Sequence, residues 1–136
     1  MAQNTTPIFG LTPHTSGITT GTSANTNKDG TGTVATVFTA GANGSKIERV
    51  FLQHMGSNTA TVIRFFVNNG STNTVATNSY LIHEEALASW SNSETAASTS
   101  TVWNCNLILP AGYKLNVVTA TAIASGVMVT AEGSDY

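Results

Sequence analysis

The sequence predicts an all-β protein, an antiparallel β-sandwich of jelly-roll-like form with an extended N-terminal arm. From residue 33 onward, short apolar runs rich in Val, Ile, Thr and Phe recur about every ten residues, and clusters of Gly and Asn separate them. A chain of 136 residues has the size of one domain, so we expect a single hydrophobic core. Together these observations favour one domain built from two sheets packed face to face.

Seven segments have the composition of strands, and they lie at residues 33–39, 46–54, 60–67, 79–86, 101–109, 113–120 and 126–132. In YKLNVV, for example, Leu115 and Val117 alternate with polar neighbours such as Asn116, which is typical of a strand with one buried and one exposed face. The helical alternative is weak everywhere except at residues 84–98, where a short turn of helix could form within a loop.

Two Asn-Gly pairs mark turns between these segments. Asn43-Gly44 follows the first predicted strand, and Asn69-Gly70 follows the third. Such pairs readily adopt the positive φ angles of tight turns. We therefore expect antiparallel neighbours on either side of each pair.

Residues 1–32 differ in composition from the rest of the chain, because they are rich in Thr and their two prolines, Pro7 and Pro13, exclude a helix. We therefore divide the chain into an extended N-terminal arm, residues 1–32, and a β-sandwich domain, residues 33–136. An extended arm can add as a strand to a neighbouring sheet, so we expect it to bind partner chains. The apolar anchors that it offers to a partner are Ile8, Phe9, Leu11 and Ile18.

The surface is expected to be neutral. Only 9% of residues are charged, whereas Thr, Ser, Asn and Gly make up nearly half of the chain, so solvent-facing positions are mostly hydroxyls and amides. Such a surface gives little electrostatic protection against association, which favours a repeated contact between subunits. The five basic residues are scattered and cannot neutralise a row of phosphates, so nucleic acid is not an expected partner.

No segment indicates a membrane or a secretory route. No apolar run approaches the ~20 residues that span a bilayer, and the N-terminus lacks a basic region followed by an apolar stretch. We expect a soluble protein made in the cytoplasm. Cys105 is the single cysteine, so no intrachain disulfide can form, and we expect it to be a small structural residue on a strand.

The stretch NTNKDG places oxygen-bearing side chains at alternate positions, as a calcium loop does. The matching ligands are Asn25, Asn27 and Asp29, and the glycine that follows stands where a calcium loop bends. Only one of these ligands is charged, and the twelfth position, where a bidentate Glu is expected, is Thr36. The pattern therefore indicates a turn before the first core strand rather than a metal site.

No combination of residues predicts catalysis. The histidines His14, His54 and His83 lie on separate segments, whereas metal sites need three or four converging ligands. Glu84 and Glu85 are adjacent, so on a strand they point to opposite faces and cannot act as a pair. The serines lack a G-x-S-x-G motif. We therefore expect a protein that is not an enzyme and that uses no metal, cofactor or small-molecule substrate.

Trp90 has two functional interpretations. β-Sandwiches can bind sugars on aromatic platforms, and the aromatic residues available for this are Trp90, Trp103, Tyr80 and Tyr113. Trp103 lies within an apolar run, which favours a place in the core. Trp90 has small polar neighbours in a predicted loop, so it is either a glycan platform or an anchor buried against a partner chain. We prefer the partner anchor.

The C-terminal stretch LILPAGYKLNVVTATAIASGVMVTAEGSDY, residues 107–136, resembles the end of small accessory virion proteins of tailed bacteriophages. The shared features are an L-P-A-G turn, a strand, an Ala/Thr-rich connection, a last strand ending in V-T-A-E-G and a terminal Asp-Tyr. The resemblance implies a structural virion protein, a capsid decoration or cement protein that binds the major capsid protein on the shell's outer surface, often as a homotrimer. A tail, collar or fibre component and a host-glycan-binding module are the alternatives.

Overall fold

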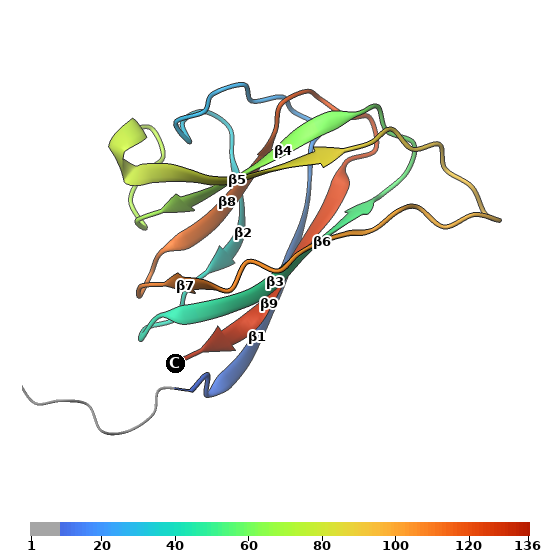
Figure 1. Cartoon of the computed structure of the whole chain (residues 1–136). Coiled ribbons are helices and arrows are strands. Elements are labelled where there is room, and N and C mark those ends of the chain that lie inside the picture. Colours follow the sequence, from blue (N-terminus) through green and yellow to red (C-terminus); the bar gives the residue numbers. More distant parts are fainter. Residues whose placement is uncertain (1–8) are drawn as a thin grey trace, which may run out of the picture.

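The computed structural model describes residues 9–136, which form two antiparallel sheets packed against each other (Figure 1). The strands are β1 (Thr12–Thr20), β2 (Ala35–Thr39), β3 (Ser45–His54), β4 (Thr61–Asn68), β5 (Ser79–Leu87), β6 (Thr101–Trp103), β7 (Leu107–Leu109), β8 (Lys114–Thr119) and β9 (Val127–Asp135). Within the described residues the one helical element is a 3₁₀ turn, η1 (Ala76–Asn78), and none of them forms a helix that could span a bilayer. The predicted all-β sandwich is confirmed.

The strand order is that of a jelly roll. One sheet runs β1-β9-β3, with β6 and β7 both pairing with the far side of β3, and the other runs β2-β8-β4-β5. Two pairs of consecutive strands stay within one sheet: β4 and β5, which are linked through η1 and pair with each other, and β6 and β7, which both pair with β3. At every other connection the chain crosses from one sheet to the other. If β6 and β7 are taken as one interrupted strand, each sheet has four strands, and two packed four-stranded sheets connected in this order define a jelly roll.

The core lies between the inner faces of the two sheets. Its largest fully buried side chains include Phe38, Phe65, Ile47, Leu52, Ile63 and Leu115. In β9, Val127, Val129 and Ala131 are buried while the residues between them are partly exposed. The alternation predicted for this last strand is therefore confirmed.

The prediction of one exposed face is wrong for β8, because residues 21–34 cross the outer face of the second sheet. The backbone N–H of Asn25 donates to the carbonyl of Thr119 at the end of β8 (2.8 Å). Phe66 is buried outside the main core cluster, under this crossing segment. Asn116, expected to face solvent, is buried as well. The inner strands of the second sheet, β4 and β8, are thus covered on both faces.

The expected arm, residues 1–32, is not separate from the sandwich in the structure. Strand β1 pairs with β9 over its whole length, from Thr12 opposite Asp135 to Thr20 opposite Val127. β1 is an edge strand, where a proline is tolerated because it has no N–H to donate to a ladder. The partly buried positions of β1 hold mostly polar residues, with Ile18 as the apolar exception, so apolar alternation could not reveal it. The sandwich therefore begins well before residue 33.

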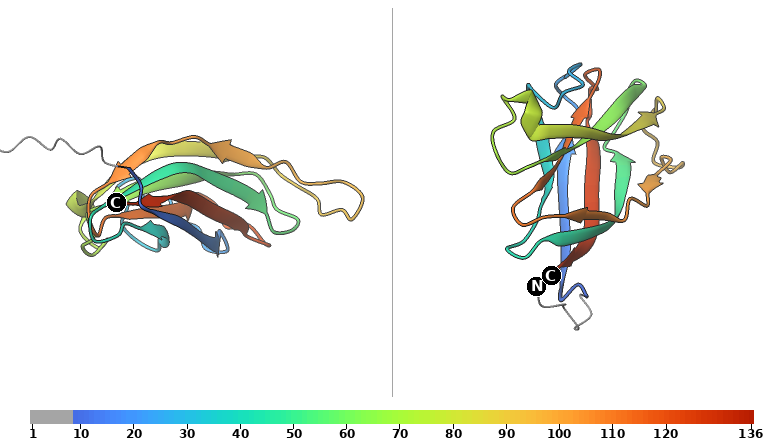
Figure 2. Two further views of the ribbon diagram at one scale, coloured as in Figure 1. Left: turned by 90° about the horizontal axis from the view of Figure 1, so that it is seen from below. Right: turned by 60° about the vertical axis from the view of Figure 1, so that its left-hand side comes forward.

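Two other segments differ from expectation. The predicted strand 101–109 is divided into β6 and β7, because Asn106 adopts a left-handed conformation with φ of 45°; among non-glycine residues, Asn tolerates this region well. The helical turn considered at residues 84–98 does not form. Instead β5 continues to Leu87, and the loop after it projects from the body of the sandwich (Figures 1 and 2).

The positive φ angles predicted for the two Asn-Gly turns are confirmed. Antiparallel pairing of the flanking strands is confirmed for only one of the turns. Gly44 and Gly70 both have φ of 90°. The Gly70 turn joins β4 to β5, which are antiparallel neighbours as expected. The Gly44 turn instead leads from β2 in one sheet to β3 in the other, so its flanking strands do not pair.

A polar cluster fastens β1 to the C-terminal strand at one corner of the sandwich. Nδ1 of His14 donates to Oδ1 of Asp135 (2.9 Å), and Oγ of the buried Ser45 donates to the same carboxylate. The His14 ring packs on Phe38 with ring centroids 4.0 Å apart. The hydrogen bond from Ser45, and after it that from His14, holds the pKa of Asp135 below its ordinary value. Asp135 thus links β1, β3 and β9.

Candidate contact surface

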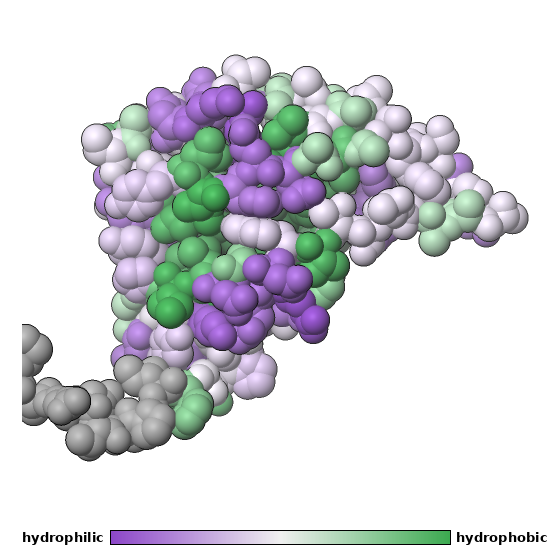
Figure 3. All heavy atoms as spheres, viewed as in Figure 1, coloured by the Kyte–Doolittle hydropathy of each residue, from purple (hydrophilic) through white to green (hydrophobic). Residues whose placement is uncertain are grey.

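The most prominent feature of the surface is an exposed apolar edge. Strand β5 ends the second sheet, and β6 and β7 end the first sheet on the same side of the molecule (Figure 1). Large apolar or aromatic side chains are exposed on these strands: Tyr80, Leu81 and Ile82 on β5, Val102 on β6 and Ile108 on β7. We name these five residues the apolar edge. Figure 3 shows hydrophobic side chains gathered over β5 and β7.

Strand β5 leaves backbone groups available as well as side chains. It pairs with β4 along one side, and no described strand lies along its other side. An edge of this kind can accept a strand from another chain, and soluble proteins usually protect it with charges, prolines or short length. The N-terminal half of β5, which carries Tyr80, Leu81 and Ile82, has no such protection.

An aromatic stack closes the gap between the two sheets behind this edge. His83 lies flat on Trp103, with ring centroids 4.3 Å apart, and Trp103 in turn contacts Phe65 in the core at 5.0 Å. The imidazole Nε2 of His83 is 3.1 Å from a carboxylate oxygen of Glu85. As predicted, Trp103 packs against the core. The stack supports the edge from within, so that the exposed side chains stand on a packed base.

Many charges on the surface of the described chain are paired with one another. The ion pairs are Lys28 with Glu84 (3.6 Å), Lys46 with Glu48 (2.9 Å), Arg49 with Glu132 (2.9 Å) and Arg64 with Glu84 (2.6 Å). The hydrogen bond from Arg64 is the main cause that lowers the pKa of Glu84, and Lys28 adds to it. Because the pairs neutralise each other locally, the surface presents little net charge to a partner.

An apolar hollow lies at the β7 end of the edge. It has a volume of about 730 Å³ and is lined by Asn43, Ile108, Leu109, Pro110 and Tyr136. Ile108 is 65% exposed, so it forms part of both the hollow and the apolar edge. A side chain of a partner could be buried here without rearrangement of the sandwich.

The predicted anchors of the N-terminal segment have different positions. Ile8 lies outside the described residues. Phe9 and Leu11 are 69% and 79% exposed just before β1, so their side chains are free to contact another chain. Ile18 is partly buried and packs against the core of its own chain, so it offers less of its side chain to a partner than Phe9 and Leu11 do.

Trp90 is half-buried and held by the backbone. Its N–H and carbonyl exchange hydrogen bonds with Asn58 (2.9 and 2.8 Å), and its ring is stacked on His54 at 6.4 Å. It lines a small cavity of about 190 Å³ beside Leu87 and Thr101. The side chain is thus positioned by its own fold, with one part still accessible to a partner.

The NTNKDG stretch forms the predicted turn. The side-chain amide of Asn25 donates to the carbonyls of Thr31 and Thr33 (2.8 and 2.9 Å), and its Oδ1 accepts from the backbone of Asn27 (3.0 Å). Asp29 accepts two hydrogen bonds from Thr31, which lower its pKa. The side chains that resemble calcium ligands are thus engaged in local hydrogen bonds.

The titratable side chains of the described residues lie in separate small groups. Within residues 9–136 no three His, Cys, Asp or Glu side chains lie close enough to hold a metal. Glu84 pairs with Arg64 while Glu85 pairs with His83, so the two carboxylates face different partners. Cys105 lies between β6 and β7 and packs against the core, and burial raises the pKa of its thiol.

No family model, curated protein or solved structure matches the chain. The candidate surface therefore rests on its geometry. Sequence patterns did not reveal it, because Leu81, Ile82 and Ile108 lie in apolar runs that are typical of core strands. Their exposure depends on β5 and β7 being edge strands, which is a property of the sheet order.

Proposed function

We propose that this chain is a structural virion protein, a capsid decoration or cement protein that binds the outer surface of a phage shell. The observation that carries the proposal is the apolar edge, which stands on a surface whose charges are locally paired. Exposed apolar patches of this kind are typical of protein contact sites. The partners would be the major capsid protein and further copies of this chain, in a homotrimer.

The fold and the C-terminal resemblance support the same class. Jelly rolls are frequent in viral capsid proteins, although they also occur in lectins, and a fold by itself does not define a function. The residues that resemble accessory virion proteins, 107–136, include β7, β8 and β9. They therefore contain Ile108 and the lining of the apolar hollow apart from Asn43.

The mechanism of a cement protein is mass action. A protein that binds only the assembled lattice stabilises that lattice by an amount that grows with its concentration and affinity. Burial of one exposed Leu, Ile or Phe side chain is worth about 1.5–3 kcal/mol. Several such side chains on the apolar edge would give one contact, and Phe9 and Leu11, before β1 at the opposite edge of the first sheet, would give another. Both contacts would depend little on salt.

The proposal is tested on purified particles with and without the protein. Particles that lack it should rupture at lower temperature or lower osmotic stress, and equal resistance would remove the cementing role. The copy number in a particle, read from a gel, tests its place. Hundreds of copies support the shell, whereas a few to a few dozen copies indicate a tail, collar or fibre component instead.

A matched pair of variants tests the surface. Ile108→Asp places a charge on the apolar edge and should weaken attachment to particles by about tenfold or more. Val75→Asp changes another exposed apolar residue, in the turn before η1, and should leave attachment unchanged. Equal attachment of both variants would exclude the apolar edge as the contact. Loss of a bound glycan on Trp90→Ala would favour the glycan-binding alternative.

A further inference from the structure

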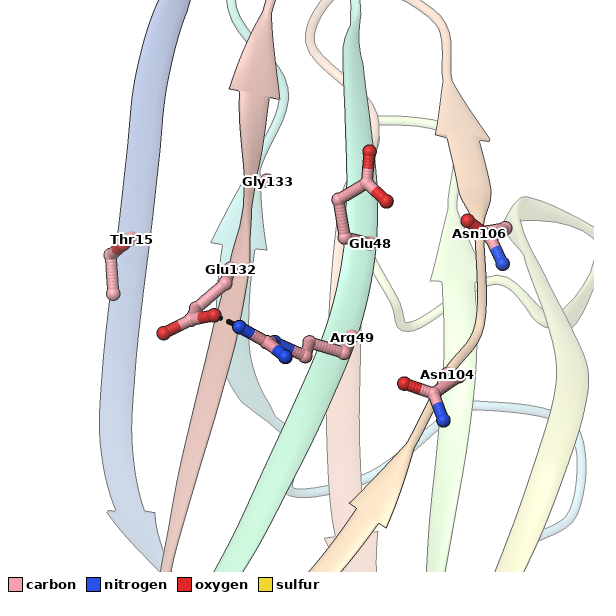
Figure 4. Close-up of a pocket in the computed structure, with 7 residues that line it drawn as sticks. All are labelled: Thr15, Glu48, Arg49, Asn104, Asn106, Glu132 and Gly133. Atoms are coloured by element: carbon pink, nitrogen blue, oxygen red, sulfur yellow. Dashed lines mark hydrogen bonds and ion pairs between the residues drawn. The ribbon is translucent and has the colours of Figure 1, made fainter.

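A polar depression crosses the outer face of the first sheet, away from the core. It has a volume of about 580 Å³, and its polar lining comes from Thr15 on β1, Glu132 on β9, Glu48 and Arg49 on β3, and Asn104 and Asn106 between β6 and β7. Figure 4 shows these side chains on β1, β9 and β3 and on the segment that links β6 to β7. The volume falls in the range of ligand sites in proteins, about 300–1,000 Å³.

Irregularities in the backbone build this depression. The pairing of β3 with β9 shifts register between Ile47 and Arg49, and the backbone N–H of Asn106 donates to the carbonyl of Glu48 (3.2 Å). Gly133 lines the hollow, and a Cβ at this position would overlap the carbonyl oxygen of Lys46. The absence of a side chain there therefore allows close strand packing and leaves the hollow open.

Arg49 is held in place before any ligand binds. Its Nε donates to a carboxylate oxygen of Glu132 (2.9 Å), and its guanidinium lies over the ring of Phe51, 5.2 Å from the centroid. The other guanidinium N–H groups are left to donate elsewhere. A polar group that is already oriented loses less entropy on binding than a free side chain does.

The two carboxamides of the depression are unused. Among residues 9–136, neither the side chain of Asn104 nor that of Asn106 makes a hydrogen bond to another protein group. Each carboxamide offers two N–H donors and one carbonyl acceptor. Because Cys105 between them packs toward the core, both carboxamides belong to the same exposed lining.

The charges that line the depression favour a neutral ligand over an anionic one. Arg49 is paired with Glu132, and Glu48 is paired with Lys46 (2.9 Å), so the lining has no excess of positive charge. A polyanion would meet two carboxylates and be repelled. A neutral ligand with many hydroxyl groups suits these residues, because hydroxyls can donate to carboxylates and accept from amide and guanidinium N–H groups.

We infer that the outer face of the first sheet carries a binding site for a neutral oligosaccharide, with Arg49, Asn104 and Asn106 as its main hydrogen-bonding residues. The site is distinct from the apolar edge and from Trp90. It does not depend on the proposed virion role, because it is tested on the isolated protein. The open shape of the depression suits a sugar chain lying across the strands better than an enclosed small molecule.

The experiment uses the full-length chain on a printed array of neutral, sialylated and sulfated oligosaccharides. The neutral set contains di- to tetrasaccharides of glucose, galactose, mannose and N-acetylglucosamine. We expect retention of at least one neutral compound. Titration of that compound into ¹⁵N-labelled protein should shift the side-chain amide signals of Asn104 and Asn106.

The double variant Asn104→Ala/Asn106→Gly tests the residues. Glycine at position 106 accepts the positive φ, so the backbone is preserved while the carboxamide is removed. Binding should weaken by about tenfold or more with unchanged thermal unfolding. The control Asn92→Ala, in the projecting loop, should bind as the wild type does.

Four results would overturn the inference. The first is that no neutral oligosaccharide binds at millimolar concentration in the titration. The second is that the array retains only sialylated or sulfated compounds. The third is that the double variant and the Asn92→Ala control bind equally well. The fourth is that Trp90→Ala alone abolishes binding, which places the site at Trp90 and excludes the sheet face.

Discussion

Replacement of Asp135 by Asn should destabilise the sandwich in a pH-dependent manner. The carboxylate accepts hydrogen bonds from His14 on β1 and from the buried Ser45 on β3. Asn at this position loses the negative charge and keeps one acceptor oxygen. The substitution therefore weakens the contact that fastens β1 and β9 to β3.

The size of the effect follows from these two bonds. A hydrogen bond to a charged group stabilises the folded state by about 1.5–3 kcal/mol, and Asp135 accepts two of them. Because Asn keeps one acceptor oxygen, we expect the free energy of unfolding to fall by about 2 kcal/mol. Unfolding entropy is about 2.1 cal/mol/K per residue, so for 136 residues this loss lowers Tm by about 7 °C. Glu94→Gln, in the projecting loop, is the matched control and should shift Tm very little.

The pH dependence has a definite sign. The folded-state pKa of Asp135 lies below the ordinary value of 3.8, so its carboxylate contributes stability above that pH and loses this contribution as the pH falls through the lowered pKa. Thermal unfolding followed by circular dichroism should show the full gap between wild type and Asp135→Asn at pH 7. The gap should close on acidification below about pH 4. Equal Tm values at pH 7, or a gap that persists in acid, would refute the reasoning.

Three further outcomes are expected. Gly133→Ala should cost about 1–3 kcal/mol or more, because its Cβ would overlap β3; a urea midpoint equal to that of the wild type would contradict this. Deletion of residues 2–20 removes β1 and should lower Tm strongly, whereas deletion of residues 2–9 should not, as thermal unfolding can show. Cys105 should react slowly with a thiol reagent at neutral pH and rapidly in denaturant, since burial raises its pKa; equal rates would show an open site.

Local patterns predicted the elements that depend on local chemistry. Alternation in β9 and the Asn-Gly turns could be read from neighbouring residues, because side chains on a strand alternate and a glycine permits positive φ. The NTNKDG turn was predictable for the same reason, since its hydrogen bonds join residues a few positions apart. The absence of helical periodicity was enough to predict the fold class.

The candidate contact surface could not be predicted in the same way. Leu81 on β5 and Ile108 on β7 have the composition of core residues, and they are exposed because the sheet order places both strands at an edge. The polar depression likewise needs Asn104 and Glu132, which are distant in sequence, on one sheet face. Residues this far apart in sequence are brought together by strand pairing, which leaves no local signal.

The sequence by itself determined that the chain is an all-β sandwich with a neutral surface and one hydrophobic core. Only the tertiary structure decided that Thr12–Thr20 is a strand of that sandwich and that residues 21–34 cover the outer face of β8. The physical reason is that the burial of a residue depends on which other segments pack against it, and the local sequence does not encode those segments. A polar strand such as β1 is held by backbone hydrogen bonds to β9 and by the His14–Asp135 contact, and neither depends on an apolar pattern.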